Sequence, residues 1–303
     1  MPLGCPRFVD VFGGSGTVML GKQPNNDFEV LNDYDGDLVN LFRCVKERPL
    51  ALIRELGFLT LNSRDDFNVL RKFIAQEEFD DAYLQEEMEL TQIMLQPVQA
   101  DEICQMMLAK ANAYDIRRAS NFLKLIRYSY ASGRKSFAAQ PFDIRKLFTH
   151  VWDSYNRLAN VVIESKDFGD LIKHYDRVNT VFYCDPPYYK SEGVYAKIFT
   201  LDDHLRLYHT LSHMKGKFLL SYNDCAFIRA MYKDYYIFDF SRIHSMVQRY
   251  EAGRQYPELL ISNYDMYERQ RSKPLQLTFP NGDEEFDYDK ILKECIISCK
   301  ISH

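Results

Sequence analysis

A cluster of glycines directly after the first apolar segment constrains the fold more than any other feature of the chain. Residues 8–12 are apolar and β-prone, and three glycines within residues 13–16 interrupt them before an apolar run resumes. Residues 28–33 form a second short strand candidate, and residues 35–48 place apolar side chains on one helix face. A strand, tight turn, helix and strand in this order indicate an α/β fold with a sheet of parallel strands.

The same alternation returns in the second half of the chain. Further strands are predicted at residues 160–164, 180–184, 217–222, 235–240 and 258–263. Helices are predicted at residues 49–55, 167–174, 201–214 and 224–232. Between the two α/β parts, residues 64–96 and 100–131 are rich in Leu, Met, Ala, Glu and Gln and favour helix without a clear strand. The pattern therefore predicts an α/β protein with a helical block inserted in it.

Composition is that of a soluble globular protein of one large domain or two modest ones. The chain has 303 residues, of which 46% are apolar and 27% charged. No run approaches the roughly 18 apolar residues of a membrane-spanning helix, and residues 1–6 do not resemble a secretory signal. Seven scattered cysteines are an odd count and indicate reduced thiols. We therefore expect a cytoplasmic protein with no membrane association.

The glycine turn at residues 10–16 is a candidate ligand site, and several interpretations compete. A dinucleotide fingerprint needs glycine or alanine where Met19 stands, and a phosphate-binding loop needs Ser or Thr where Gln23 stands. A pocket for S-adenosylmethionine needs neither, because that ligand carries no phosphate. Asp33, at the end of the next strand, suits a ribose with two free hydroxyls. A turn without any ligand also stays open.

A second candidate site is the tetrapeptide Asp185-Pro186-Pro187-Tyr188, which follows an apolar strand. Two prolines stiffen the backbone and remove two N–H donors. What remains is a set of acceptors, the Asp185 carboxylate and nearby carbonyls, beside the aromatic ring of Tyr188. Such a set fits an exocyclic amine on a planar base, whereas the alternative is a simple Asp-Pro turn that ends the strand.

Together the two sites resemble the DNA adenine methylase family of N6-adenine DNA methyltransferases. The matching segments, in the family's order, are residues 10–16, 32–33, 167–168, 185–188, 221–224 and 258–263. The resemblance covers roughly residues 8–264 and implies a Rossmann-like class I methyltransferase sheet with S-adenosylmethionine as cofactor. By the same resemblance, the cofactor-binding residues are Asp10, Phe12, Gly14, Gly16, Asp33, Asp167 and Phe168. The implied catalytic residues are Asp185, Pro186 and Tyr188, which act on an adenine flipped out of a specific duplex sequence.

The spacing leaves room for an inserted domain. From Asp33 to Asp185 is 152 residues, whereas two strands and two helices need about 60, so roughly 90 are left over. The resemblance implies a helical target-recognition domain at residues 59–146, which interrupts a catalytic domain at 1–58 and 147–265 and precedes a C-terminal extension at 266–303. Residues 114–150 contain eight basic and two acidic side chains. This segment is either a solvated helix face or the contact with double-stranded DNA, for which the candidates are Arg117, Arg118, Lys124, Arg127, Arg134 and Lys135.

Two other functions remain alternatives at this point. The family's lysine- and glycine-containing motif upstream of the first strand is not visible here, which favours a non-catalytic or partner-dependent DNA-binding homologue. An amine methyltransferase acting on RNA or cytosine is the other alternative. The family resemblance also suggests a restriction-modification partner, and a monomer or a dimer. No metal site is expected: His209 and His213 suit surface or packing roles, as do Cys295, Cys299 and His303.

Overall fold

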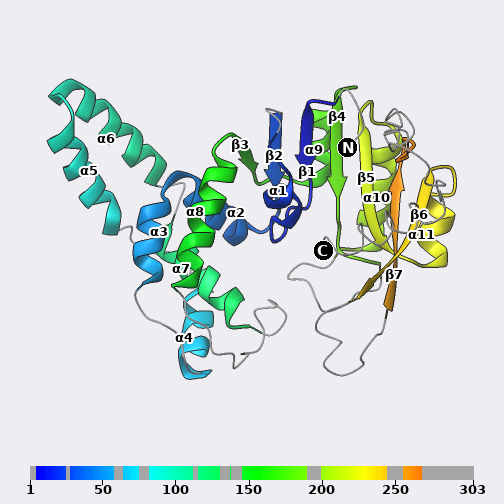
Figure 1. Ribbon diagram of the computed structural model, residues 1–303, viewed down its shortest axis with the longest axis horizontal. Helices are drawn as coiled ribbons and strands as arrows, with labels where there is room; N and C mark the ends of the chain where they lie inside the picture. Colours follow the sequence, from blue (N-terminus) through cyan, green and yellow to red (C-terminus); the bar gives the residue numbers. More distant parts are fainter. Residues whose placement is uncertain are drawn as a thin grey trace, which may run out of the picture. The chain divides into compact units, whose positions relative to one another are not determined.

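A seven-stranded sheet organises the fold (Figure 1). The computed structural model describes residues 5–24, 28–57, 64–74, 82–111, 115–129, 137, 145–189, 199–243 and 255–267. The strands are β1 (Arg7–Asp10), β2 (Phe28–Asn32), β3 (Val161–Glu164), β4 (Thr180–Cys184), β5 (Lys217–Asn223), β6 (Tyr236–Ile243) and β7 (Gln255–Ser262). Their order is β3-β2-β1-β4-β5-β7-β6; β1 to β5 pair in parallel, and β7 is antiparallel to both neighbours. The predicted α/β sheet is thereby confirmed, and each strand end lies within three residues of its predicted place.

The strand order reverses at β1, which lies between β2 and β4. In open α/β sheets such a reversal creates a crevice beyond the carboxyl ends of the two diverging strands. Asp10 of β1 is in register with Tyr183 of β4, and the Val11 N–H donates to the Tyr183 carbonyl at 2.9 Å. The loops that follow β1 and β4 therefore begin side by side.

Local sequence signals fix the ends of several helices. The Asp35 side chain accepts from the Asp37 N–H at 3.0 Å at the start of one helix, and Pro49 begins the next. Thr200 and Asp203 form a reciprocal capping box at the start of another. The helices that flank the sheet are α1 (Thr17–Gly21), α2 (Gly36–Glu47), α3 (Pro49–Leu56), α8 (Lys146–Leu158), α9 (Phe168–Tyr175), α10 (Leu201–Ser212) and α11 (Ala226–Met231).

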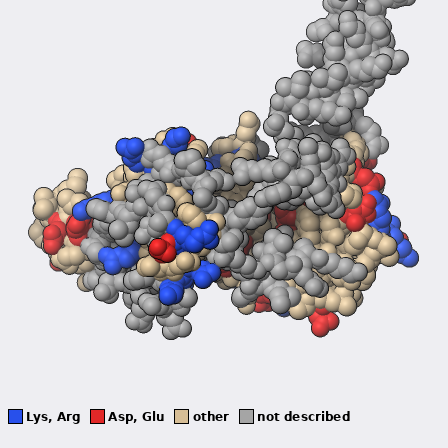
Figure 2. Space-filling view, turned by 90° about the horizontal axis from the view of Figure 1, so that it is seen from below, with Lys and Arg blue, Asp and Glu red and all other residues tan. Residues whose placement is uncertain are grey.

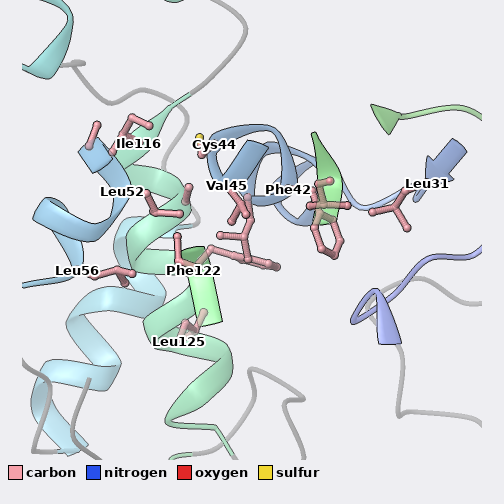
Figure 3. Close-up of a cluster of buried hydrophobic side chains, with 14 of the residues drawn as sticks. Leu31, Phe42, Cys44, Val45, Leu52, Leu56, Ile116, Phe122 and Leu125 are labelled. Atoms are coloured by element: carbon pink, nitrogen blue, oxygen red, sulfur yellow. The ribbon is translucent and has the colours of Figure 1, made fainter. Parts of the chain in front are cut away.

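Two hydrophobic cores cover the two faces of the sheet, because successive strand residues point to opposite sides. Phe8 and Leu31 belong to the core formed with α2, α3 and α8, whereas Val9 and Val30 belong to the core formed with α9, α10 and α11. Figure 3 shows part of the first core. Burying one Val, Leu or Phe side chain stabilises the folded state by roughly 1.5–3 kcal/mol, because its apolar surface is removed from water. Burial on both faces explains why the parallel strands are almost continuously apolar.

The inserted block consists of α4 (Arg64–Ile74), α5 (Ala82–Met94), α6 (Pro97–Ala111) and α7 (Ile116–Arg127) in the described part of residues 58–144. Among its described residues, buried apolar side chains of α4 and α7 belong to the first core. Ile116, Phe122 and Leu125 of α7 share the first core with α2 and α3, as Figure 3 shows. The predicted helical character of the block is therefore confirmed, whereas its boundaries at 59–146 and its role as a recognition domain stay predictions.

Helix α8 was not predicted from the sequence, and it starts at the predicted end of the insertion. Its buried residues Val151 and Leu158 anchor it to the first core. The predicted C-terminal extension lies, apart from its first two residues, outside the described ranges. Within those ranges, every helix is too short or too polar to cross a membrane, and no cluster of His, Cys, Asp and Glu side chains has the arrangement of a metal site.

Candidate active site

One buried side chain, Asn32, joins the loops that follow three neighbouring strands. Its Nδ2 donates to the Val11 carbonyl at 2.9 Å and to the Lys166 carbonyl at 3.1 Å. Its Oδ1 accepts from the Lys166 N–H at 2.8 Å. Asn32 was matched to the family from the sequence but was given no role, because these partners are far away in the chain. The carboxyl ends of β1, β2 and β3 are thus held in one arrangement.

Replacing Asn32 with alanine should lower the free energy of unfolding by about 3 kcal/mol, because buried backbone groups at Val11 and Lys166 lose their partner. Urea denaturation measures this change. Asn156→Ala, on the exposed side of α8, is the matched control and should leave stability unchanged. Equal stability of the two variants would show that the three loops do not depend on Asn32.

The glycine turn after β1 is tightly packed. A Cβ at Gly13 would lie 2.5 Å from Leu31 Cδ1 and 2.9 Å from the Asn32 carbonyl oxygen. Gly14 and Gly16 have φ angles of 50° and 73°, in the left-handed region that favours glycine. The Gly14 N–H donates to Asp33 Oδ2 at 2.8 Å, which fixes the turn against the loop after β2. Gly14 and Gly16 were the glycines predicted to bind the cofactor, whereas a Cβ at Gly13 would have the closest neighbours.

Three carboxylates interact at the carboxyl ends of the strands: Asp10 at the end of β1, Asp33 after β2 and Asp185 after β4. Asp10 is only 1% exposed, and burial raises its pKa to about 7, with smaller contributions from the negative charges of Asp185 and Asp33. Burial also raises the pKa of Asp33, although this carboxylate accepts from the Gly14 and Asp35 N–H groups. The buried Asp10 Oδ1 has no hydrogen-bond partner among the described residues. This carboxylate therefore suits a ligand that brings a donor or a positive charge.

The loop after β4 presents the predicted acceptor set beside these carboxylates. Asp185 is partly exposed, Pro186 is buried, and the Tyr188 hydroxyl lies 3.1 Å from Ser221 Oγ. Burial is the main cause of a raised Tyr188 pKa, so the hydroxyl stays protonated at neutral pH. Because this loop and the glycine turn leave adjacent strands, the structure brings together the two sites that the sequence analysis separated by more than 160 residues.

The predicted pair Asp167 and Phe168 lies at the start of α9, after β3. Asp167 accepts two hydrogen bonds from Arg206 of α10, at 2.7 and 2.9 Å, and one from the Gly169 N–H at 2.9 Å. Burial opposes ionisation of Asp167, but these hydrogen bonds prevail and lower its pKa. The Arg206 side chain also lies over the Phe168 ring, 4.1 Å from its centroid. Arg206 was missed because nothing in its local sequence indicates a partner 39 residues away.

An aromatic group links this pair to the glycine turn. The ring centroids of Phe12, Phe168 and Phe199 are separated by 5.6 to 5.9 Å. Phe168 is 6% exposed, so its ring is largely buried. The predicted residues Phe12 and Phe168 are therefore in contact, although the two segments are far apart in the chain.

The predicted DNA contacts on α7 divide by helix face. Arg117 and Arg127 are exposed, with Arg117 Nε 3.8 Å from Glu55 Oε1, and Arg118 forms an ion pair with Asp37 of α2. Lys124 is only 2% exposed and donates to the Glu55 carbonyl at 3.3 Å, and burial lowers its pKa to about 8. Lys124 is therefore corrected to a core position, because it shares a helix face with Ile116 and Ser120. Two further predicted contacts, Arg134 and Lys135, lie outside the described residues.

Basic side chains are visible on the helical side of the molecule in Figure 2.

The comparison with known protein families agrees with the motifs that suggested the family from the sequence. The family model described as "D12 class N6 adenine-specific DNA methyltransferase" matches residues 1–251, which is most of the 303-residue chain. The match spans the glycine turn, the loop after β4 and the inserted helices. The chain belongs to the D12 class N6 adenine-specific DNA methyltransferases, and it is an enzyme.

Proposed function

We propose that this chain transfers the methyl group of S-adenosylmethionine to the N6 amine of adenine in a specific duplex DNA sequence, after flipping the base out of the helix. The observation that carries the proposal is the juxtaposition of the glycine turn after β1 with the Asp185 loop after β4. The family supports adenine methylation of DNA, and methyltransferases generally use this cofactor.

The residues around the glycine turn fit S-adenosylmethionine. The buried Asp10 carboxylate has an oxygen without a partner among the described residues, and this cofactor offers an ammonium group and a sulfonium. Gly14 and Gly16 add no side chains to the turn, so a ligand can approach the backbone at these two positions. Asp33 retains acceptor lone pairs for ribose hydroxyls. When bound, the cofactor supplies an electrophilic methyl group on a positively charged sulfur. Asp10, Asp33 and the glycine turn are the groups that would hold it.

Asp185 and Pro186 would act on the adenine amine. The nitrogen lone pair is delocalised into the ring, so the amine is a weak nucleophile and must be aligned and polarised. The Asp185 carboxylate and the Pro186 carbonyl are acceptors for its two protons, and the carboxylate stabilises positive charge that develops on the nitrogen. Alignment of the reacting groups adds to this electrostatic contribution.

Tyr188 would provide the surface on which the extruded adenine stacks. A base inside a duplex cannot reach acceptors at the edge of a sheet, so it must leave the helix. An aromatic ring partly replaces the lost stacking, which contributes about 1–3 kcal/mol per base.

Arg117 and Arg127 are the described residues of α7 best placed to contact phosphates. Replacing both with alanine should weaken binding to duplex DNA similarly for all sequences and reduce the slope of log K against log salt by up to about 2. Arg177→Ala is the matched control, because this exposed residue precedes β4 and therefore lies at the amino ends of the parallel strands, away from the candidate site. Fluorescence anisotropy at several salt concentrations measures both effects, and an unchanged slope would exclude these two side chains as phosphate contacts.

The proposed substrate is tested with labelled methyl groups. Purified protein is incubated with S-adenosylmethionine carrying a radioactive methyl group and with duplexes that contain or lack adenine. We expect label only in the duplexes that contain adenine. Label in adenine-free DNA would contradict the proposed substrate. Calorimetry with S-adenosylmethionine tests the cofactor separately, and failure to bind would contradict catalysis by this chain.

A further inference from the structure

Three consecutive residues of β5 contact two consecutive residues of the loop after β4. Ser221 Oγ lies 3.1 Å from the Tyr188 hydroxyl, and the Tyr222 ring lies 6.3 Å from the Tyr188 ring, centroid to centroid. The Asn223 side chain donates to the Tyr189 carbonyl at 3.2 Å. We call Ser221, Tyr222 and Asn223 the β5 clamp.

The β5 clamp continues a strand that is paired on both sides up to Leu220 and with β7 alone from Ser221 onward. Residues up to Leu220 pair with β4, and Ser221 to Asn223 pair with Leu260 to Glu258 of β7. Ser221 is 4% exposed, so little space is available for movement of its side chain. Groups that must be placed accurately are held best by regular strands of this kind.

A second layer of contacts supports the clamp. The Tyr222 hydroxyl lies 2.6 Å from His204 Nδ1, and both side chains are buried. The Tyr189 ring stacks on Phe227 at a centroid distance of 4.6 Å and an angle of 23°. The residue after Tyr188 is thereby fixed by its carbonyl and by its ring.

The hydrogen bond to Ser221 acts on the direction of the Tyr188 ring. The phenol oxygen lies on the long axis of the ring, so a partner there fixes where that axis points and restricts χ1. It does not fix the rotation of the ring about the axis, which neighbouring side chains such as Tyr222 limit instead. Losing the hydroxyl bond should therefore misplace the ring without removing its aromatic face.

We propose that Ser221 is a positioning residue, which orients Tyr188 so that its ring meets the extruded adenine in the geometry for methyl transfer. This inference rests on the proposed function, because it concerns the same site. It assigns to Ser221 no contact with the adenine or with the cofactor, since its effect passes through Tyr188.

A double-mutant cycle on Ser221 and Tyr188 tests the inference. Ser221→Ala and Tyr188→Phe each remove the same hydrogen bond, and each should lower kcat for methylation of unmethylated genomic DNA by roughly three- to ten-fold. The double variant should be no slower than Tyr188→Phe alone, because the bond is already absent. Ser221→Thr keeps a hydroxyl and should restore most of the activity.

Two controls separate positioning from general damage. Ser120→Ala is the same substitution at a fully buried serine on the core side of α7, and it should leave kcat unchanged. S-adenosylmethionine affinity, measured by calorimetry, should be unchanged in the Ser221 variants. If Ser221→Ala does not fold, Tyr188→Phe and Ser221→Thr still test the hydrogen bond from its other end and with its hydroxyl kept.

The outcomes distinguish this inference from the function on which it rests. If the wild type methylates DNA but the effects of the two substitutions are additive, the role of Ser221 is overturned and the proposed function is not. Wild-type kcat in Ser221→Ala would do the same. Wild-type protein that transfers no methyl group to DNA would overturn the proposed function and this inference with it.

Discussion

Replacing Asp185 with alanine should reduce methyl transfer to DNA by about a thousand-fold or more, while S-adenosylmethionine still binds within a few-fold of wild type. The side chain supplies the charged acceptor for the adenine amine, and the neighbouring Pro186 carbonyl is an uncharged acceptor that does not replace this charge. Its removal leaves in place Asp10, Asp33 and the glycine turn, which are the groups that would hold the cofactor, so S-adenosylmethionine should still bind.

Single-turnover kinetics with labelled cofactor measures this loss, and calorimetry measures cofactor affinity. Asp185→Asn keeps an acceptor oxygen without the charge and should fall between wild type and alanine. Asp153→Ala, an exposed aspartate on α8, is the matched control and should behave as wild type. Turnover near wild type in Asp185→Ala would rule out the mechanism described above.

Asp10→Asn should change stability and cofactor binding in opposite directions. In the folded protein burial, with smaller contributions from the negative charges of Asp185 and Asp33, raises the pKa of Asp10 from 3.8 to about 7. A raised carboxyl pKa means that the folded state holds a proton that the unfolded state releases. The resulting stability is present below about pH 4 and is lost as the pH rises to about 7, on the order of 4 kcal/mol. Asparagine has no such ionisation, so the apo variant should be more stable than wild type at pH 8.

The same substitution should weaken S-adenosylmethionine binding at least about ten-fold, because it removes a buried charge that suits a cationic ligand. Urea denaturation of cofactor-free protein at pH 5 and pH 8, with calorimetry at pH 8, measures both quantities. Asp153→Asn is the control for a carboxylate in water. A variant with wild-type stability at pH 8 and wild-type cofactor affinity would show that Asp10 is not a buried carboxylate that binds the cofactor.

The sheet could be predicted from the sequence because its signals are local. Apolar strands of four to eight residues alternate with helices, and the glycines after β1 end that strand in an unambiguous turn. Helix α8 escaped prediction because Thr149, Trp152 and Tyr155 have lower helix propensity than the residues of the preceding block. Tertiary packing of Val151 and Leu158 stabilises it instead.

The candidate site was predictable only in part. Its acidic and glycine positions follow strands directly, so the rule that ligands bind at carboxyl ends located them. Its pairings, such as Tyr188 with Ser221 and Asp167 with Arg206, join separate elements and depend on how the strands align. The burial of Lys124 was accessible from spacing, because it lies eight residues after buried Ile116 on the same helix face. Lys124 was predicted as a DNA contact because only the positive charge of the segment was considered, and not the helix face on which it lies.

The most direct measurement is mass spectrometry of nucleosides from DNA treated with the protein and S-adenosylmethionine. The DNA comes from a host without methylation, so any modified base is the product of this chain. We expect N6-methyladenine among the nucleosides of DNA treated with wild type, and its absence when Asp185→Ala replaces wild type. N4-methylcytosine as the product, or unmodified DNA after incubation with protein that binds the cofactor, would contradict it.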